Sequence, residues 1–163
     1  MNTLYTYVLI ADRYAHQLEY AFERVKDKLS IIAVDADQLS DEDWLNINAL
    51  RGAFSALLAL IEDHIFFHIL DASAESVLNL TFIDILNLLE KRNFIPSAQD
   101  WKSFHYIRQS IFYEYPQNLE KQNQHLMTVI QGGQWLYIFW KDLRLWIEKR
   151  IFEILKSSNL QYS

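Results

Sequence analysis

Hydrophobic residues recur at three- and four-residue intervals along three long stretches of the chain, which is the pattern of amphipathic α-helices. The pattern predicts helices over Asn2–Leu29, Asp41–Asp71 and Leu119–Lys156. Between the first two helices, the segment 30–38 breaks this periodicity and carries no strong helix signal. We therefore expect three long helices to supply most of the core.

Two shorter helices are predicted between the second and third long helices. A helix start is indicated where a hydroxyl residue precedes an aspartate by three positions, because each side chain can accept a hydrogen bond from the other residue's backbone N–H. Three residues with this spacing are Ser40, Thr81 and Ser97. We expect the first short helix to end near Arg92. The second should end near Tyr115, because Pro116 disfavours helical geometry in the residue before it.

Glycine and proline are scarce, with three and two in the whole chain, so few sharp turns separate the helices. The sequence predicts an all-α fold, an up-and-down bundle of about five helices. It forms one domain over residues 1–163, with a frayed tail at 157–163. Gly52 costs its helix about 1 kcal/mol relative to alanine, and a close helix–helix contact is one explanation. Gly132 and Gly133 indicate either close packing or a kink in the last helix.

Composition narrows the range of functions. The chain has no cysteine, which excludes disulfide and thiolate chemistry. Its formal net charge of -6 at pH 7 argues against a general nucleic-acid-binding surface but leaves room for a local RNA site. Neither a signal peptide nor a stretch apolar enough to span a membrane stands out, so we expect a cytoplasmic protein with no membrane contact. Aromatic residues make up 15% of the chain, an excess that indicates a protein–protein interface.

A dense cluster of polar and aromatic residues closes the fourth predicted helix. It consists of Arg108 and Gln109, followed after three residues by Tyr113, Glu114, Tyr115 and Pro116. Together with Thr-Phe-Ile-Asp at 81–84, Ile-Pro-Ser at 95–97 and Asp-Trp at 100–101, it resembles the HepT-like branch of the HEPN proteins. That family carries Arg, usually Asn, three variable residues, His, a polar residue and Tyr, often before Pro. The likeness is specific over residues 81–118 and a matter of helical pattern elsewhere.

The resemblance implies a metal-independent ribonuclease site, often completed across a dimer. Arg108 would hold the scissile phosphate, a task that suits the guanidinium fork. This chain departs from the family at two positions, with Gln109 in place of Asn and Tyr113 in place of the catalytic His. A phenol with an ordinary pKa near 10 is a poor base at neutral pH. Losing the imidazole removes about two to four orders of magnitude of acid–base catalysis. The candidate catalytic residues are Arg108, Tyr113 and Glu114, while His105 lies on the wrong side of Arg108 to replace the missing His within the motif.

The resemblance also implies a partner and a modification site. In HepT-like proteins the tyrosine that corresponds to Tyr115 receives an adenylate from a minimal nucleotidyltransferase, which blocks ribonuclease action. A bulky negative group at Tyr115 would occupy the phosphate site beside Arg108. The implied setting is a prokaryotic toxin–antitoxin pair in which this chain forms a homodimer, and no cofactor is implied.

Three hypotheses follow. The first is a dimeric HepT-like module that binds a nucleotidyltransferase and has weak or lost ribonuclease activity. The second is an active ribonuclease toxin that cuts RNA with Arg108, Tyr113 and Tyr115. The third is an interaction bundle with no nucleic-acid role, in which the aromatic residues pack the core and Arg108 pairs with a carboxylate such as Glu114.

A zinc site is a further possibility that the sequence raises and disfavours. His64, His68 and Asp71 are spaced to share one face of a helix, as two imidazoles and a carboxylate would in a zinc site. The glutamate of an HExxH motif is missing between the two histidines. We interpret the three residues as the solvated edge of an apolar helix and predict no metal.

Overall fold

The computed structural model describes residues 3–73 and 76–153, and within these ranges it holds helices and loops but no strand. The all-α bundle predicted from the sequence is confirmed. The long helices are α1 (Thr3–Val25), α3 (Asp41–Leu60) and α7 (Leu119–Trp146). The shorter ones are α2 (Leu29–Val34), α4 (Phe66–Ala72), α5 (Phe82–Lys91) and α6 (Ala98–Ser110). Single π-helical turns follow α3 at Ile61–Ile65 and α7 at Ile147–Ile151. The predicted end of the last helix at Lys156 and the tail 157–163 lie outside the described residues.

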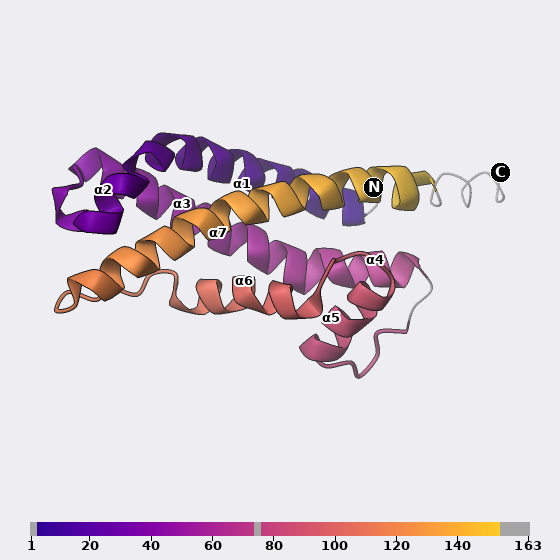
Figure 1. Ribbon diagram of the computed structural model, residues 1–163. Helices are drawn as coiled ribbons and strands as arrows, with labels where there is room; N and C mark the ends of the chain where they lie inside the picture. The colour runs from indigo at the N-terminus through magenta and orange to yellow at the C-terminus, as the bar shows by residue number, and fades with distance from the viewer. Residues whose placement is uncertain (1–2, 74–75, 154–163) are drawn as a thin grey trace.

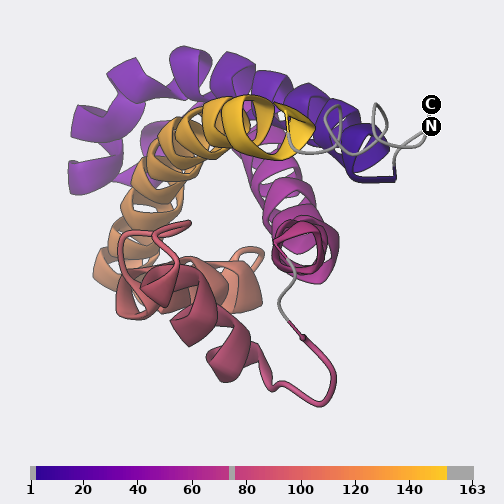
Figure 2. The same ribbon diagram turned by 90° about the vertical axis from the view of Figure 1, so that its right-hand side faces the viewer.

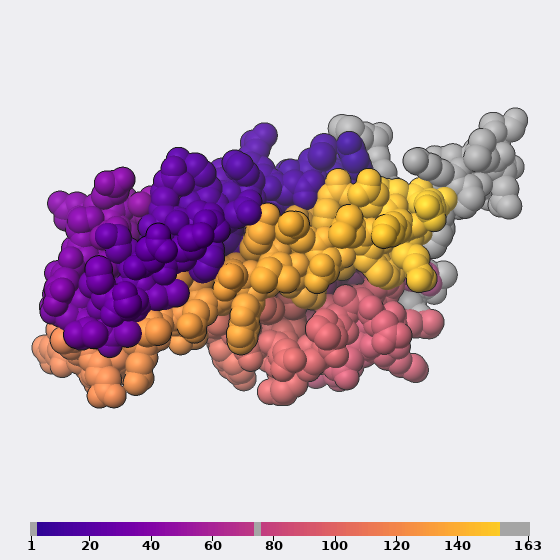
Figure 3. Space-filling view, turned by 45° about the horizontal axis from the view of Figure 1, so that its top comes forward, coloured from indigo at the N-terminus to yellow at the C-terminus, as the bar shows by residue number. Residues whose placement is uncertain are grey.

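The long helices run along the length of the molecule, and α5 and α6 complete the bundle (Figures 1 and 2). α1 packs against α3 and α7, and α6 also packs against α3 and α7. On the face shown in Figure 3, α7 lies between α1 and the α5–α6 pair. Four helices contribute the largest buried side chains of the core, which are Phe54, Phe66, Trp101 and Trp140.

The second predicted helix is confirmed as one continuous run from Asp41 to Ala72, in which α3, a π-helical turn and α4 follow without a break. Its start is capped as predicted, because Ser40 and Asp43 each accept a backbone N–H from the other at 3.1 Å. By length and composition this run can cross a bilayer, contrary to the expectation that no stretch can. Its most apolar window is 56% buried inside the bundle, as in the core helix of a folded domain.

The two adjacent glycines of α7 allow close approach of neighbouring helices. A Cβ atom on Gly132 would lie 2.9 Å from Ile107 of α6. A Cβ atom on Gly133 would lie 3.3 Å from both Leu18 of α1 and Leu50 of α3. α7 continues through both residues, so close packing, and not a break in the helix, explains them.

Gly52 of α3 faces open space, where a Cβ atom would meet no atom within 4 Å. The expectation of a close helix–helix contact at Gly52 is therefore wrong for this chain. Gly52 instead lines a groove of about 510 Å³ between α1 and α3. The remaining lining residues are His16, Gln17, Tyr20, Ala21, Asn46, Ala49 and Ala53.

The segment after α1 is helical where the sequence indicated no helix. It contains α2 and a 3₁₀ turn at Ala36–Gln38. The side chain of Asn123 in α7 holds this corner, because its Oδ1 accepts the Ala36 N–H at 3.1 Å and its Nδ2 donates to the Val34 carbonyl at 3.2 Å. A tertiary contact therefore supports a helix that the local pattern does not reveal.

α6 ends at Ser110, five residues before the predicted end at Tyr115. Tertiary contacts hold the chain away from the helical path. Glu114 pairs with Arg51 of α3, and the Tyr115 N–H donates to the side-chain oxygen of Gln122 at 2.7 Å. The predicted motif is consequently divided between the last turn of α6 and the loop that follows.

Candidate functional site

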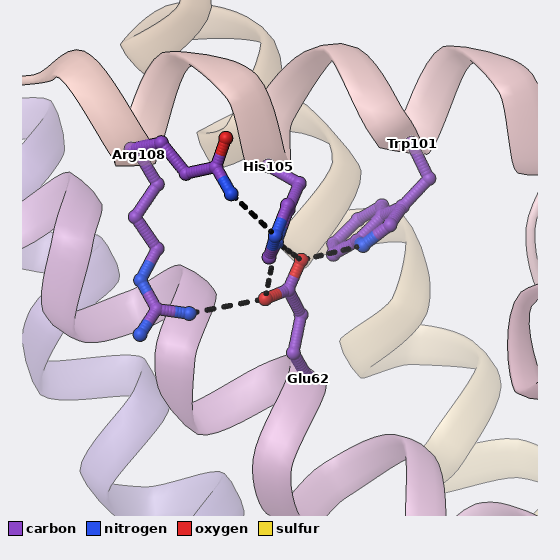
Figure 4. A network of polar contacts seen from close by, with 5 residues as sticks. Glu62, Trp101, His105 and Arg108 are labelled. Atoms are coloured by element: carbon purple, nitrogen blue, oxygen red, sulfur yellow. Dashed lines mark hydrogen bonds and ion pairs between the residues drawn. The ribbon is translucent and has the colours of Figure 1, made fainter. Parts of the chain in front are cut away.

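A buried carboxylate, Glu62, gathers three side chains from one face of α6 (Figure 4). The indole N–H of Trp101 donates to Glu62 Oε1 at 3.0 Å, and Nη1 of Arg108 donates to Oε2 at 3.1 Å. Nδ1 of His105 lies 3.3 Å from both carboxylate oxygens. The side chain of Glu62 is only 3% exposed, so these groups replace the water that it has lost.

Local geometry explains the convergence. Trp101, His105 and Arg108 are spaced by four and three residues, which places them on one face of α6. Glu62 lies in the π-helical turn Ile61–Ile65. Such turns occur often at functional sites, because the extra residue in the turn changes where the neighbouring side chains point. Figure 4 shows the Glu62 side chain pointing at the three residues of α6.

The carboxylate of Glu62 is shielded from solvent, whereas the side chains of His105 and Arg108 are partly exposed. Burial raises the pKa of Glu62, because its charged form loses hydration, although His105, Trp101 and Arg108 all act in the opposite direction. The side chains of His105 and Arg108 are 34% and 30% exposed. Gln109 is exposed and places its Nε2 3.3 Å from Nε2 of His105. Solvent therefore reaches the side chains of His105 and Arg108 but not the carboxylate that they share.

A second polar cluster is centred on Arg51, whose guanidinium is 2% exposed. Its Nη1 donates to Glu114 at 2.9 Å and to the side-chain oxygen of Asn48 at 3.1 Å. Gln122 of α7 anchors the loop that follows α6, because its side-chain amide donates to Glu114 and accepts the Tyr115 N–H. Nε and Nη2 of Arg51 are buried and have no hydrogen-bond partner among the described residues. Glu114 thus serves as the counterion of a buried cation.

Tyr115, the predicted modification site, is half-buried in this loop. The centre of its ring lies 5.4 Å from that of Tyr113 and 5.6 Å from that of His125. Nζ of Lys121 lies 4.5 Å from the same ring centre. Burial, followed by the charge of Arg51, lowers the pKa of His125 and favours its neutral form. Tyr113 is 62% exposed, so the phenol at the predicted catalytic position faces solvent.

The structure divides the three predicted catalytic residues between the two clusters. Arg108 pairs with Glu62, and Glu114 pairs with Arg51 of α3. Tyr113 lies in the loop between α6 and α7. Arg108 pairs with a carboxylate, as the third hypothesis expects, but that carboxylate is Glu62 and not Glu114. His105 precedes Arg108 and so cannot replace the missing His within the motif, but its imidazole contacts the same Glu62 carboxylate as Arg108.

Motif reasoning missed two charged residues of the second long helix, Arg51 and Glu62. A signal for them exists, because Arg51 follows Ile47 by four residues and Glu62 lies four after Leu58 and three before Ile65. Both therefore fall on the apolar stripe, where a charge needs a partner. The sequence does not say which distant residue that partner is.

The two histidines of the possible zinc site pack against an aromatic ring. The rings of His64 and His68 stack on Tyr7, with centres 4.4 Å and 5.5 Å away. Across residues 3–73 and 76–153, no group of three His, Cys, Asp or Glu side chains is placed to hold a metal ion.

Comparison with protein-family models, with curated proteins and with solved structures finds no match for the chain. A functional proposal therefore depends on the sequence resemblance over residues 81–118 and on the geometry of the Glu62 and Arg51 clusters.

Proposed function

We propose that the protein is a HepT-like, dimeric binding module that partners a minimal nucleotidyltransferase in a prokaryotic cytoplasm, with ribonuclease activity weak or lost. One observation carries the proposal: both charged side chains of the motif are already paired with buried side chains of α3 and the π-helical turn that follows it, Arg108 with Glu62 and Glu114 with Arg51. An arginine held by a buried carboxylate is less available to a phosphate. The missing imidazole at position 113 acts in the same direction, because it removes the acid–base group.

Cleavage of mixed cellular RNA tests the loss of activity. We expect the native protein and Arg108→Ala to leave the RNA intact, and Tyr113→His to gain cleavage if the missing base is the main defect. Cleavage by the native protein that disappears in Arg108→Ala would contradict the proposal. That result would establish the alternative, an active ribonuclease toxin that cuts RNA with Arg108 and Tyr113 or Tyr115.

Modification at Tyr115 tests the partnership. The half-buried ring of Tyr115 lies in a tied-down loop beside the amine of Lys121, a cation suited to a phosphate-bearing group. The native protein, incubated with ATP and the nucleotidyltransferase encoded beside it, should gain the mass of adenylate. Tyr115→Phe should gain none, whereas the matched Tyr113→Phe variant should be modified normally. Equal modification of both variants, or none in the native protein, would contradict this part of the proposal.

The outer face of α7 supports the dimer. Trp135, Ile138 and Leu145 are 65%, 50% and 51% exposed and share one face of the helix. Large exposed apolar side chains grouped in this way are typical of protein interfaces. Light scattering at micromolar concentration should show a dimer for the native protein and a monomer for Trp135→Lys. The control Leu45→Lys, at a site 70% exposed on α3, should remain dimeric. A monomeric native protein would exclude the dimer.

A further inference from the structure

A pocket of about 390 Å³ lies between the loop that joins α5 to α6 and the second half of α7. Three aromatic residues line it, Phe94 from the loop and Phe139 and Trp146 from α7. Its volume falls in the range of about 300–1,000 Å³ that is usual for small-molecule sites. Asp142, an exposed residue, carries the only charge among the described lining residues. The other lining residues are Asn93, Ile95, Pro96 and Leu143.

The loop that carries Phe94 is fixed at both ends by hydrogen bonds. At the end of α5, Asn93 takes a left-handed backbone conformation with φ of 60°, and the Phe94 N–H donates to the Leu89 carbonyl at 2.9 Å. Such a turn commonly ends a helix. At the start of α6, the Ala98 N–H donates to the Glu90 carboxylate at 2.6 Å. The loop wall of the pocket is therefore preformed, which lowers the cost of binding a ligand.

Two rings of the pocket meet at a right angle. The ring centres of Phe94 and Trp146 lie 4.2 Å apart, and their planes are inclined at 89°. Phe139 packs against Trp101 of the core, with ring centres 4.7 Å apart. Aromatic cages bind alkylated ammonium groups with rings set at such angles around one space, because the face of each ring carries partial negative charge.

The charges of α7 favour a cation in this pocket. Asp142 lines it, whereas the two cations nearest to Asp142 in the sequence, Lys141 and Arg144, line a separate pocket against α1. Arg144 donates to Asp12 at 3.1 Å, and Nζ of Lys141 lies 5.5 Å from the ring centre of Tyr137. A cation that enters the aromatic pocket is attracted by Asp142, whereas an anion is repelled.

We propose that this pocket binds an organic cation, an ammonium group carried on an apolar body. The rings of Phe94, Phe139 and Trp146 contact the alkyl groups of the cation, and Asp142 supplies the opposite charge. An uncharged apolar ligand of the same shape gains the contacts with the rings but neither the attraction to their faces nor that to the carboxylate. This binding is separate from the proposed partnership with a nucleotidyltransferase.

Choline and its uncharged carbon isostere, neohexyl alcohol, test the preference for a cation, because the two molecules share a shape and differ in charge. NMR titration of the indole N–H resonance of Trp146, assigned with Trp146→Phe, measures both affinities. The native protein should bind choline on the order of tenfold more tightly than the alcohol, a difference typical of cation–π contacts in partly desolvated sites. Equal affinities, or no shift with either ligand, would overturn the proposal.

Variants of the lining residues locate the preference. Asp142→Asn should weaken choline binding at least about fourfold, the effect of one charge about 5 Å away in water, and should leave the affinity for the alcohol unchanged. The matched control Glu120→Gln removes the same charge from α7 about 33 Å along the helix and should change neither affinity.

Phe94→Leu removes one ring and keeps an apolar side chain, so it should bring the two affinities closer together. Their ratio is measured within a single variant, so a smaller fraction of folded protein does not imitate the effect. The native ratio in both Asp142→Asn and Phe94→Leu would overturn the proposal.

A short peptide with one trimethyl-lysine identifies the source of the cation. Tighter binding of the peptide than of choline would assign the pocket to a side chain of a protein partner, and comparable or weaker binding would assign it to a free small molecule. Either result supports a cation site. RNA cleavage and adenylation of Tyr115, which test the proposed function, do not depend on this pocket.

Discussion

Replacing Gly52 with alanine should stabilise the protein, because the glycine weakens α3 and no part of the described chain uses the space that it leaves. Within α3 the residue has ordinary helical geometry, since no glycine in the described ranges has a positive φ. A Cβ atom would meet nothing within 4 Å, so the substitution carries no steric cost. Alanine then gains its helix-propensity advantage of about 1 kcal/mol.

Thermal unfolding followed by circular dichroism measures this effect. For a chain of this size, about 1 kcal/mol corresponds to an increase of about 2–4 °C in melting temperature. Gly133→Ala is the matched control, because its Cβ atom would lie 3.3 Å from both Leu18 and Leu50. Crowding there opposes the same gain in propensity, so Gly133→Ala should be less stable than Gly52→Ala.

A melting temperature for Gly52→Ala equal to or below that of the native protein, at a concentration where the chain is monomeric, would refute this reasoning. If the stabilisation appears at low concentration and is lost at high concentration, a second copy occupies the groove between α1 and α3. That result would also move the dimer contact away from the outer face of α7.

Three further predictions concern the two polar clusters. Because its pKa is raised in the fold, Glu62 contributes stability that is present below its unfolded pKa of about 4.3 and lost as the pH rises through its folded pKa. The free energy of unfolding of Glu62→Gln in urea should thus increase relative to that of the native protein from about pH 4 to about pH 7, and a constant difference would contradict this assignment. His125 has a lowered pKa, so it contributes stability that is lost as the pH falls through its unfolded value of about 6.5. His125→Phe should therefore be less acid-sensitive between about pH 7 and about pH 5, and an unchanged pH profile would exclude that role. Glu114→Ala leaves the buried guanidinium of Arg51 without its counterion and should lower the free energy of unfolding by about 1–3 kcal/mol. Arg51→Met removes the buried nitrogens that have no partner, so it should lower the free energy of unfolding by less. The reverse order in urea unfolding would contradict the role of Glu114 as counterion.

Much of the fold could be predicted from the sequence, because helix formation depends on nearby residues. The capping pairs at Ser40 and Thr81 form as predicted, since both members of each pair lie within one turn. The apolar stripes of the long helices are buried, because a period near 3.6 residues defines one face wherever that face packs. Local signals failed for α2 and for the end of α6, where Asn123 and Arg51 act from other helices.

Only part of the candidate site could be predicted from the sequence. The spacing of Trp101, His105 and Arg108 shows that they share a face of α6, and Arg108 was singled out from its motif. Their common acceptor is Glu62, 39 residues before Trp101 and 46 before Arg108, and no local pattern links residues so far apart. The motif also joined Arg108 to Glu114 in one site, whereas the structure gives each a different counterion.

The sequence by itself determined the all-α class, the start of each long helix within the described residues and the faces that they bury. These properties depend on side chains within a few residues of one another. Tertiary structure decided the charge partners, because a buried ion must be paired by whichever opposite charge the packed helices bring within reach. It also decided that Gly133 lies at a close helix–helix contact while Gly52 lines a groove, since the same residue type acquires its role from the surface that packs against it.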